Sequence, residues 1–251
     1  PALPIQSLSK YIPTYKPSHS NANEFDGEEE PYNSASHIIT HMARDWTAVG
    51  VSIRNDTYDW IVDQLLSYHD VQFNGHSQPQ LDSTCSQQSP LSPVLVPGAG
   101  MARLAFDIAF AARNQNDNDG TKHCYPFVVE AVDNSIVMAT AAYHLLHHPD
   151  FLKIYPIAAD PFINEVDTHW RWDSAVFPEE DVVDQLRRLR VQQTSHQPSL
   201  SYVIGDFVSV YASPSKHGMY GSIATCFFID TSTNIYEYIL TIRNLLRTGG
   251  V

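Results

Sequence analysis

The chain has 251 residues, and 43% of them are hydrophobic, which predicts one larger globular domain with a sizeable core. The formal net charge of −13, from 15 basic and 28 acidic side chains, repels phosphate backbones, so the composition argues against a nucleic-acid partner. No apolar run reaches the ~18 residues of a membrane-spanning helix, so no membrane partner is expected.

The three cysteines are Cys85, Cys124 and Cys226, which are far apart and lack CxxC spacing. This pattern disfavours both a disulfide framework and a cysteine-rich zinc site. It fits a reducing compartment, so we expect a cytoplasmic protein, with the nucleus as a second expected location.

The N-terminal part of the chain divides into an arm and a helical region. Residues 1–33 are rich in Pro, Ser, Asn and acidic residues, which predicts a disordered acidic arm. Residues 34–92 are predicted to form N-terminal helices followed by a polar linker, with Asn55 or Asp56 capping the start of the second helix. These helices offer a candidate surface for a homodimer.

Residues 93–251 alternate between apolar strands and amphipathic helices, which predicts a parallel sheet with helical crossovers. The predicted strands are 94–96, 125–133, 199–206 and 220–230, and the predicted helices are 101–113, 134–148 and 233–247. The polar residues 114–123 indicate a surface loop. Together with residues 149–198, which include an amphipathic helix at 179–190, they form predicted insertions.

The expected fold is therefore α/β, with a doubly wound, mostly parallel sheet of the Rossmann-like kind and an N-terminal helical extension. Four strands leave an apolar edge uncovered, and a fifth strand should begin at Val251, the last residue. We therefore expect the C-terminal strands of the fold to be missing from this chain.

Glycines and an acid stand where the first two predicted strands end, which is where open α/β sheets bind ligands. Gly98 and Gly100 let the backbone approach a ligand closely, although a plain structural turn explains the same residues. Asp133 is placed to accept hydrogen bonds from ribose hydroxyls, with Glu130 as the fallback candidate. The alternative for either acid is a solvated side chain at the strand end.

Two further acids follow the third and fourth predicted strands. Asp206 can accept a hydrogen bond from an adenine amino group, with Phe207 beside the base. A helix cap at Asp206, with Phe207 in the core, explains the same residues equally well. Asp230 stands between an apolar run and a helix, and taken alone a helix N-cap is its stronger interpretation.

The glycine turn favours S-adenosyl-L-methionine over a dinucleotide as the nucleoside cofactor. A dinucleotide-binding GxGxxG turn needs a third glycine beside the pyrophosphate, and Arg103 occupies that position. S-adenosyl-L-methionine has no phosphate, and its methionine carboxylate can lie near the turn. A nucleotide-linked dehydrogenase is the disfavoured alternative.

The histidines do not predict a metal site. His37 and His41 are four residues apart on a predicted helix, and His144, His147 and His148 form a second group. Neither group has a further ligand at a suitable spacing, and methyl transfer requires no metal. Surface or packing roles are therefore expected for these histidines.

Several stretches resemble those of the carnosine N-methyltransferases, a branch of the class I S-adenosylmethionine-dependent methyltransferases. They are "RDW" with a glycine four residues on (44–50), "LVPGAGMARLAFDIA", "KIYP" (153–156), "GDF" (205–207) and "IATCFFIDTSTNIYEYILTI" followed by "LLRTGG". The last stretch is long and unusual, so it carries most of the resemblance, which spans residues 34–251 with gaps at the polar loops.

The resemblance implies S-adenosyl-L-methionine as the cofactor and Asp230 as the residue that binds the substrate and acts in catalysis. The cofactor contacts that it implies are Arg44, Gly98, Asp133, Asp206 and Phe207, with Ser222 lining the site. His41 stands where the family has a glutamine that touches the cofactor. Ala102 replaces a glycine of the family's donor-turn pattern, and a helix N-terminus tolerates that change.

The substrate implied by the resemblance is a small imidazole compound such as the dipeptide carnosine. One ring nitrogen would attack the sulfonium methyl group while Asp230 accepts the N–H of the other, which gives anserine from carnosine. Methylation of a protein histidine or of another amine stays open as an alternative, as does a non-catalytic module that binds the cofactor.

Overall fold

The computed structural model describes residues 35–74, 91–111, 113–117, 120–124, 126–148, 150–156, 172–188 and 198–251. The acidic arm predicted for residues 1–33 lies outside the described residues, as do 75–90 of the predicted linker and 157–171 and 189–197 of the second predicted insertion.

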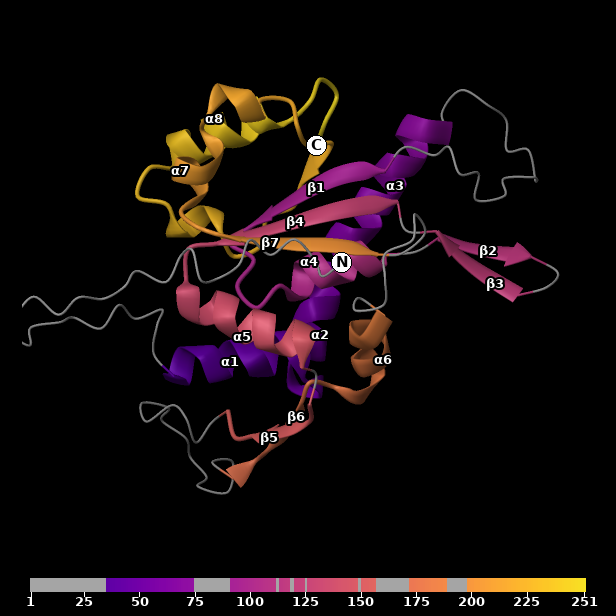
Figure 1. The fold of residues 1–251 in the computed structure, drawn as a ribbon, viewed down its shortest axis with the longest axis vertical. Coiled ribbons are helices and arrows are strands. Elements are labelled where there is room, and N and C mark those ends of the chain that lie inside the picture. Colours follow the sequence, from indigo (N-terminus) through magenta and orange to yellow (C-terminus); the bar gives the residue numbers. More distant parts are fainter. Residues whose placement is uncertain are drawn as a thin grey trace, which may run out of the picture.

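A four-stranded parallel sheet forms the centre of the molecule (Figure 1). Its strands are β1 (Ser92–Pro97), β4 (Phe127–Asp133), β7 (Ser199–Ile204) and β8 (Ser222–Ile223). They are ordered β7-β4-β1-β8, and every neighbouring pair is parallel. The chain therefore adds β4 and β7 on one side of β1 and then places β8 on the other side of β1. This order confirms the predicted doubly wound, mostly parallel sheet.

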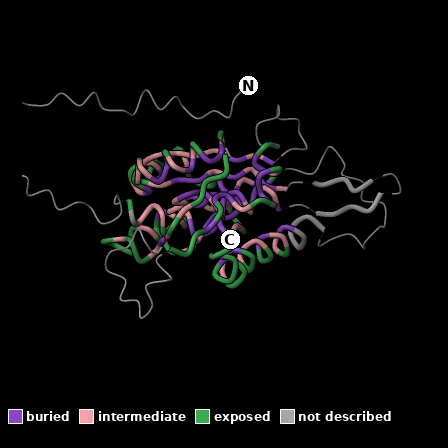
Figure 2. Tube along the Cα trace, turned by 90° about the horizontal axis from the view of Figure 1, so that it is seen from below, coloured by how far each residue is buried: buried purple, intermediate pink, exposed green. Residues whose placement is uncertain are grey.

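Helices cover both faces of this sheet (Figure 1). On one face lie α4 (Arg103–Phe110), α5 (Ile136–His147) and α6 (Glu180–Arg188), and on the other lie α7 (Phe207–Tyr211) and α8 (Ile235–Leu245). Alternate side chains of β1 belong to two separate hydrophobic core clusters. Val94 and Val96 pack with the first group of helices, and Leu95 packs with the second. Burial on both faces explains the nearly continuous apolar run of this strand, and Figure 2 shows the buried residues gathered in the middle of the molecule.

The N-terminal helices pack against the first core cluster. They are α1 (Ala35–Trp46), the 3-10 turn η3 (Ala48–Gly50), α2 (Val51–Arg54), the π-helical segment η4 (Asn55–Asp59) and α3 (Trp60–Asn74). Trp46 is fully buried, and its indole N–H donates to the carbonyl of Met101. The prediction that Asn55 or Asp56 caps a helix is wrong, because helical backbone already begins at Val51 and continues through both residues.

Two antiparallel strand pairs extend from the central domain (Figure 1). They are β2 (Arg113–Asp117) with β3 (Gly120–Cys124), and β5 (Leu152–Ile154) with β6 (Ala175–Phe177). The prediction of a surface loop at 114–123 is therefore wrong: residues 114–117 and 120–123 are strand, and 118–119 lie outside the described residues. A ladder of backbone hydrogen bonds does not need an apolar face, so the polar sequence gave no alternation that would predict it.

The fourth predicted strand, residues 220–230, is much shorter than expected. Only Ser222–Ile223 pairs with β1; then Phe227 adopts a left-handed backbone (φ 54°) and a 3-10 turn η7 forms at Ile229–Thr231. The apolar run continues as a loop because Phe228 turns into the second core cluster. Another 3-10 turn, η6, spans Pro214–Lys216.

Val251 lies beside β8. Its N–H donates to the carbonyl of Gly221, and its carbonyl accepts from the N–H of Ile223. The last residue of the chain is thus bonded along the edge of β8 that faces away from β1.

Candidate active site

A cavity of about 640 Å³ lies at the carboxyl ends of the parallel strands and is closed on one side by α1. The predicted site residues that line it are His41, Arg44, Gly98, Gly100, Asp133, Asp206, Phe207 and Asp230. Side chains that sequence reasoning did not select also contribute, among them Tyr58, Cys226, Phe227, Thr231 and Tyr238. The cavity occupies the topological switch point, where doubly wound folds bind ligands.

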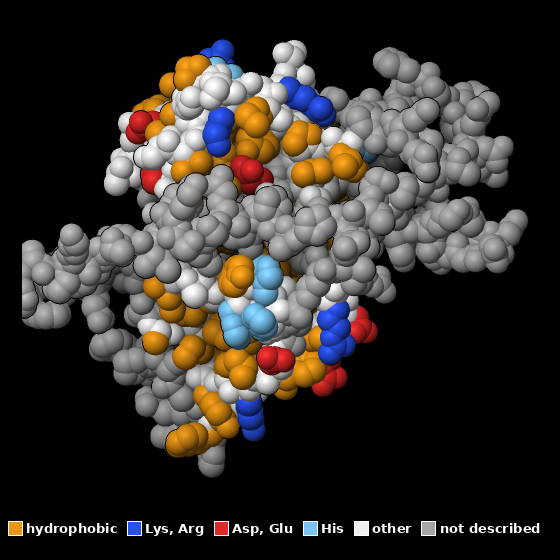
Figure 3. Space-filling model, in the orientation of Figure 1, with side chains coloured by type: hydrophobic (Ala, Val, Ile, Leu, Met, Phe, Trp, Pro, Cys, Tyr) orange, Lys and Arg blue, Asp and Glu red, His pale blue; other side chains and the backbone are white. Residues whose placement is uncertain are grey.

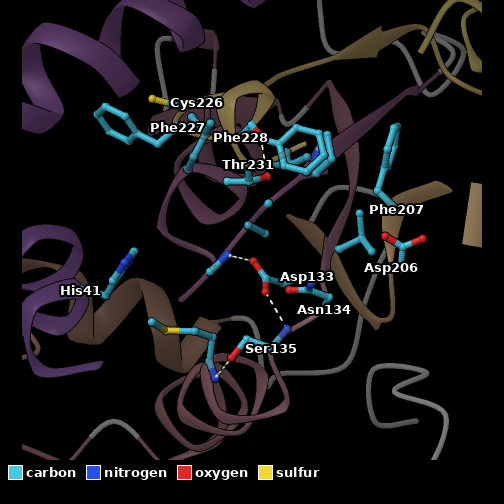
Figure 4. A pocket seen from close by; sticks show the side chains of 18 of the residues that line it. His41, Asp133, Asn134, Ser135, Asp206, Phe207, Cys226, Phe227, Phe228 and Thr231 are labelled. Carbon is cyan, nitrogen blue, oxygen red and sulfur yellow. Dashed lines mark hydrogen bonds between the residues drawn. The ribbon is translucent and has the colours of Figure 1, made fainter. Parts of the chain in front are cut away.

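The cavity runs from α1 to the start of α7 (Figure 4). His41 and Phe227 lie at one end, and Asp206 and Phe207 lie at the other. Asp133 lies between them, at the end of β4. The arrangement suits a long ligand that has a different chemical group at each end.

The Asp133 carboxylate ties together the two turns at the centre of the cavity. Its Oδ2 accepts from the backbone N–H of Gly100 (2.8 Å), and its Oδ1 accepts from the N–H of Ser135 (2.8 Å). A carboxylate has about four acceptor positions, so each oxygen retains capacity for a ligand hydroxyl. Asp133 therefore fixes the glycine turn and still presents acceptors to the cavity.

Glu130, the fallback candidate, lies elsewhere. Its Oε1 accepts from the hydroxyls of Tyr211 (2.5 Å) and Tyr220 (2.7 Å) on the opposite face of the sheet. Burial is the main cause that raises the pKa of both tyrosines, and the hydrogen bond to Glu130 is the second cause. Both hydroxyls therefore stay protonated and act as donors. Side chains alternate along a strand, so a residue three positions before Asp133 points to the other face. The interpretation of Glu130 as a ribose ligand is therefore wrong.

The structure confirms the helix-cap and core interpretation of Asp206 and Phe207. Asp206 is the N-cap of α7, and its Oδ1 accepts from the N–H of Ser209 (2.8 Å). The Phe207 ring is buried, with the rings of Phe228 and Tyr238 5.4 and 5.3 Å away between centroids. Both residues nevertheless line the cavity. The cap and the core packing hold them in place without removing them from the site.

At the other end, α1 presents an arginine that is held by a buried carboxylate. Arg44 donates through Nε to Asp45 Oδ1 (2.6 Å) and through Nη2 to Asp45 Oδ2 (3.1 Å). The same Nη2 lies 3.0 Å from His41 Nδ1, and the guanidinium lies 5.1 Å from the centroid of the Phe227 ring. Sequence reasoning used Arg44 but missed Asp45, although both belong to the "RDW" stretch.

The electrostatics of Asp45 depend on these partners. Burial alone would raise the pKa of this carboxyl, but hydrogen bonding to His41 and Arg44 and the charge of Arg44 outweigh that effect and lower it. The carboxylate is thus charged although only 1% of the residue is exposed. A buried charge of this kind is stable only while its partners stay in place.

Asp230 does not cap a helix. It lies in η7, whereas α8 begins at Ile235 with Asn234 as its N-cap. The N-cap interpretation is therefore wrong, because the chain makes a 3-10 turn and an extended step before the helix starts. The side chain is exposed and lines the cavity, and within the described part of the chain its carboxylate has no hydrogen bond or ion pair.

Ser222 is the predicted site residue that the structure places apart from the others. It belongs to β8, pairs with Val94 and is only 2% exposed. It is not among the residues that line the cavity.

Arg103, which replaces the third glycine of a dinucleotide turn, has a structural role. Its Nε donates to Asp107 (2.8 Å), and its Nη1 donates to the carbonyl of Asp45 (2.9 Å) and to Glu179 Oε1 (2.5 Å). The guanidinium therefore joins α4 to the end of α1 and to the residue before α6. The Arg103 side chain therefore occupies the position at which a pyrophosphate-binding turn needs a glycine without a side chain.

The backbone conformation and close packing of Gly98 predict that a side chain there destabilises the fold. Its φ is +66°, and a Cβ there would lie 2.5 Å from Cδ2 of Phe228. Gly98→Ala should therefore lower the free energy of unfolding by about 2–4 kcal/mol, from backbone strain plus overpacking. Urea denaturation measures the loss.

Gly100→Ala is the matched control for that change. Gly100 also has a positive φ (+51°), but the nearest heavy atom to its added Cβ would be His41 Nδ1 at 3.8 Å. This variant should show the backbone strain alone, about 1–2 kcal/mol. Equal losses for the two variants would show that contact with Phe228 does not restrict position 98.

Histidines on the face drawn in Figure 3 gather over α5, whose last turn contains His144 and His147. Across the described residues, no group of three or more His, Cys, Asp or Glu side chains is placed to hold a metal ion. In the same part of the chain, no helix is both long and apolar enough to cross a bilayer.

The sequence matches known proteins along most of its length. The family model for carnosine N-methyltransferase matches residues 21–251. A carnosine N-methyltransferase of Schizosaccharomyces pombe is 27% identical over 248 residues, which are 95% of this chain and 55% of the relative. Carnosine N-methyltransferase unmet of Drosophila melanogaster is 28% identical over 231 residues, which are 91% of this chain and 42% of the relative.

Among solved structures, a Methanococcus maripaludis protein assigned as an S-adenosyl-L-methionine-dependent methyltransferase aligns with a TM-score of 0.37 and 12% identity, over 80% of this chain and 57% of that one. The chain spans about half the length of the curated relatives it matches. The family model, in contrast, covers nearly the whole chain. The chain therefore belongs to the carnosine N-methyltransferase family.

Proposed function

We propose that the chain binds S-adenosyl-L-methionine in the cavity and transfers its methyl group to an imidazole nitrogen of a small histidine-containing dipeptide such as carnosine. Family membership supports the reaction class, and the names of the relatives suggest the substrate. The observation that carries the proposal is the exposed Asp230 carboxylate, which lines the same cavity as the glycine turn and has no partner among the described residues.

The lining residues fit the parts of the proposed donor. Asp133 offers carboxylate acceptors at the middle of the cavity, where a ribose would lie between the two ends. Asp206 and the Phe207 ring suit an adenine at the α7 end, because the acid can accept from its amino group and the ring can pack on its face. Arg44, at the α1 end, suits the methionine carboxylate. When bound, the donor supplies a sulfonium methyl group.

Asp230 would orient the acceptor. Its carboxylate accepts the N–H of one imidazole nitrogen, which fixes the tautomer and leaves the lone pair of the other nitrogen free to attack the methyl carbon. As the new N–C bond forms, the C–S bond breaks and its electron pair stays on sulfur. The ring becomes positively charged, and the neighbouring carboxylate stabilises that charge. With carnosine as the acceptor, the product is anserine.

Two binding and activity measurements test this proposal. Calorimetry should detect binding of S-adenosyl-L-homocysteine, the donor without its methyl group, and should detect no binding of NAD. Labelled methyl donor should then transfer its label to carnosine, with mass and ring position read on the product.

The same binding and labelling measurements also test the alternative functions that the sequence leaves open. Label on protein histidine or on a non-imidazole amine would contradict the dipeptide substrate, and binding without any transfer would indicate a non-catalytic module. The homodimer through the N-terminal helices and the cytoplasmic or nuclear location remain predictions of the sequence.

A further inference from the structure

Asp45 is buried behind the wall of the cavity, and three donor atoms converge on its carboxylate. Arg44 Nε lies 2.6 Å from Oδ1, Arg44 Nη2 lies 3.1 Å from Oδ2, and the Tyr58 hydroxyl lies 3.1 Å from Oδ1. The residue is 1% exposed and does not line the cavity, whereas Arg44 and Tyr58 both do. Asp45 Oδ2 also lies 3.8 Å from His41 Nδ1, so Asp45 contacts three cavity residues without lining the cavity itself.

The donors of Arg44 divide into two sets. Nε and Nη2 point back to Asp45 and His41, and the Phe227 ring lies 5.1 Å from the guanidinium carbon. In the described residues, the two N–H groups of Nη1 have no hydrogen-bond partner, although the side chain lines the cavity. An arginine with one edge paired and the other edge open has the geometry of a fixed carboxylate receptor.

The backbone beneath this pair is also held in place. Arg54 Nη1 donates to the carbonyl of Arg44 (2.7 Å), and Arg103 Nη1 donates to the carbonyl of Asp45 (2.9 Å). Gly50 packs so closely that an added Cβ would overlap the Arg44 carbonyl. A side chain that starts from a fixed backbone and ends on a fixed carboxylate loses little further entropy when it binds an anion.

We propose that Asp45 is a positioning residue, which holds the Arg44 guanidinium so that Nη1 binds the carboxylate of the donor's methionyl group. This inference rests on the proposed function, because it assumes a donor that carries such a carboxylate. Asp45 also offsets the positive charge of Arg44, so recognition depends on the direction of the two Nη1 donors more than on net charge. Loss of Asp45 would leave a charged but mobile guanidinium.

A pair of ligands separates positioning from general structural support. S-adenosyl-L-homocysteine carries the carboxylate, and 5′-methylthioadenosine retains the adenosine part but lacks it. Calorimetry on the whole chain should show that Asp45→Asn weakens binding of the first by about tenfold, while binding of the second changes by less than about twofold. In an Arg44→Met background, Asp45→Asn should change neither affinity by more than about twofold, because the side chain that it positions is gone.

A milder variant keeps the test valid if Asp45→Asn does not fold, as judged by circular dichroism. Tyr58→Phe removes only the hydroxyl that donates to Oδ1 of Asp45. It should weaken binding of S-adenosyl-L-homocysteine by about two- to threefold and leave the affinity for 5′-methylthioadenosine unchanged.

Equal losses for the two ligands, or a loss that persists in the Arg44→Met background, would overturn the inference and leave Asp45 a structural residue. An unchanged affinity of the folded variant for S-adenosyl-L-homocysteine would overturn it as well. If the unaltered chain bound neither ligand, the proposed function would fail first, and the inference would fall with it.

Discussion

Asp230→Ala is expected to reduce the rate of methyl transfer to carnosine by about a thousandfold or more, while the affinity for S-adenosyl-L-homocysteine changes by less than about threefold. The carboxylate is exposed in the cavity and is not engaged by any described residue, so its removal leaves no buried partner unpaired. The expected loss is confined to the reaction, where the carboxylate would orient the imidazole and stabilise its developing charge. Single-turnover rates with labelled donor measure it.

Two variants make that result interpretable. Asp230→Asn keeps the size of the side chain and one acceptor oxygen but removes the charge, so we expect an intermediate loss of rate. Glu237→Ala removes an exposed carboxylate from the first turn of the nearby helix α8, outside the cavity lining, and should leave the rate unchanged. If Asp230→Ala lowered donor affinity and the free energy of unfolding as much as the rate, Asp230 would be a structural residue.

Glu179→Ala is expected to have the largest effect on stability, a loss of about 3–5 kcal/mol in the free energy of unfolding. Both oxygens of Glu179 accept from Arg54 Nη2 (2.9 and 2.8 Å), and Oε1 also accepts from Arg103 Nη1 (2.5 Å). The two arginine side chains are only 5% and 11% exposed. Removing the carboxylate leaves two buried positive charges with fewer compensating partners.

A surface ion pair provides the control for Glu179→Ala. Asp184 and Arg187 on α6 form a pair 2.9 Å apart, and their side chains are 81% and 63% exposed. Asp184→Ala should therefore cost less than about 1 kcal/mol. Urea denaturation of both variants measures the difference, and a loss below about 1 kcal/mol for Glu179→Ala would contradict the importance of this buried cluster.

The sequence predicted those parts of the fold that have a local signal. Val94 to Val96 is a short apolar run between prolines, and it forms the central strand β1. Gly98 and Asp133 directly follow apolar runs, so the sequence predicted them at the carboxyl ends of strands, and both line the cavity there. The order of elements then predicted the doubly wound topology, because parallel strands need helical crossovers.

Other features depend on contacts between distant parts of the chain and have no local signal. Glu179 meets Arg54 across 125 residues, and no spacing rule joins them. The left-handed backbone at Phe227 ends the fourth strand early, although its apolar sequence predicts a longer one. Asp45 was missed for a similar reason, since its importance follows from burial beneath Arg44 and Tyr58. Strand ends and motif resemblance predicted the cavity residues, whereas the residues that hold them in place are recognised only from their packing.

A structure of the chain bound to S-adenosyl-L-homocysteine and carnosine tests the central claim most directly. We predict that an Asp230 carboxylate oxygen lies within hydrogen-bonding distance, about 2.7–3.2 Å, of one imidazole nitrogen, and that the other nitrogen faces the sulfur of the donor product. An imidazole bound away from Asp230, or turned so that neither nitrogen faces the sulfur, would contradict the proposed role of this carboxylate.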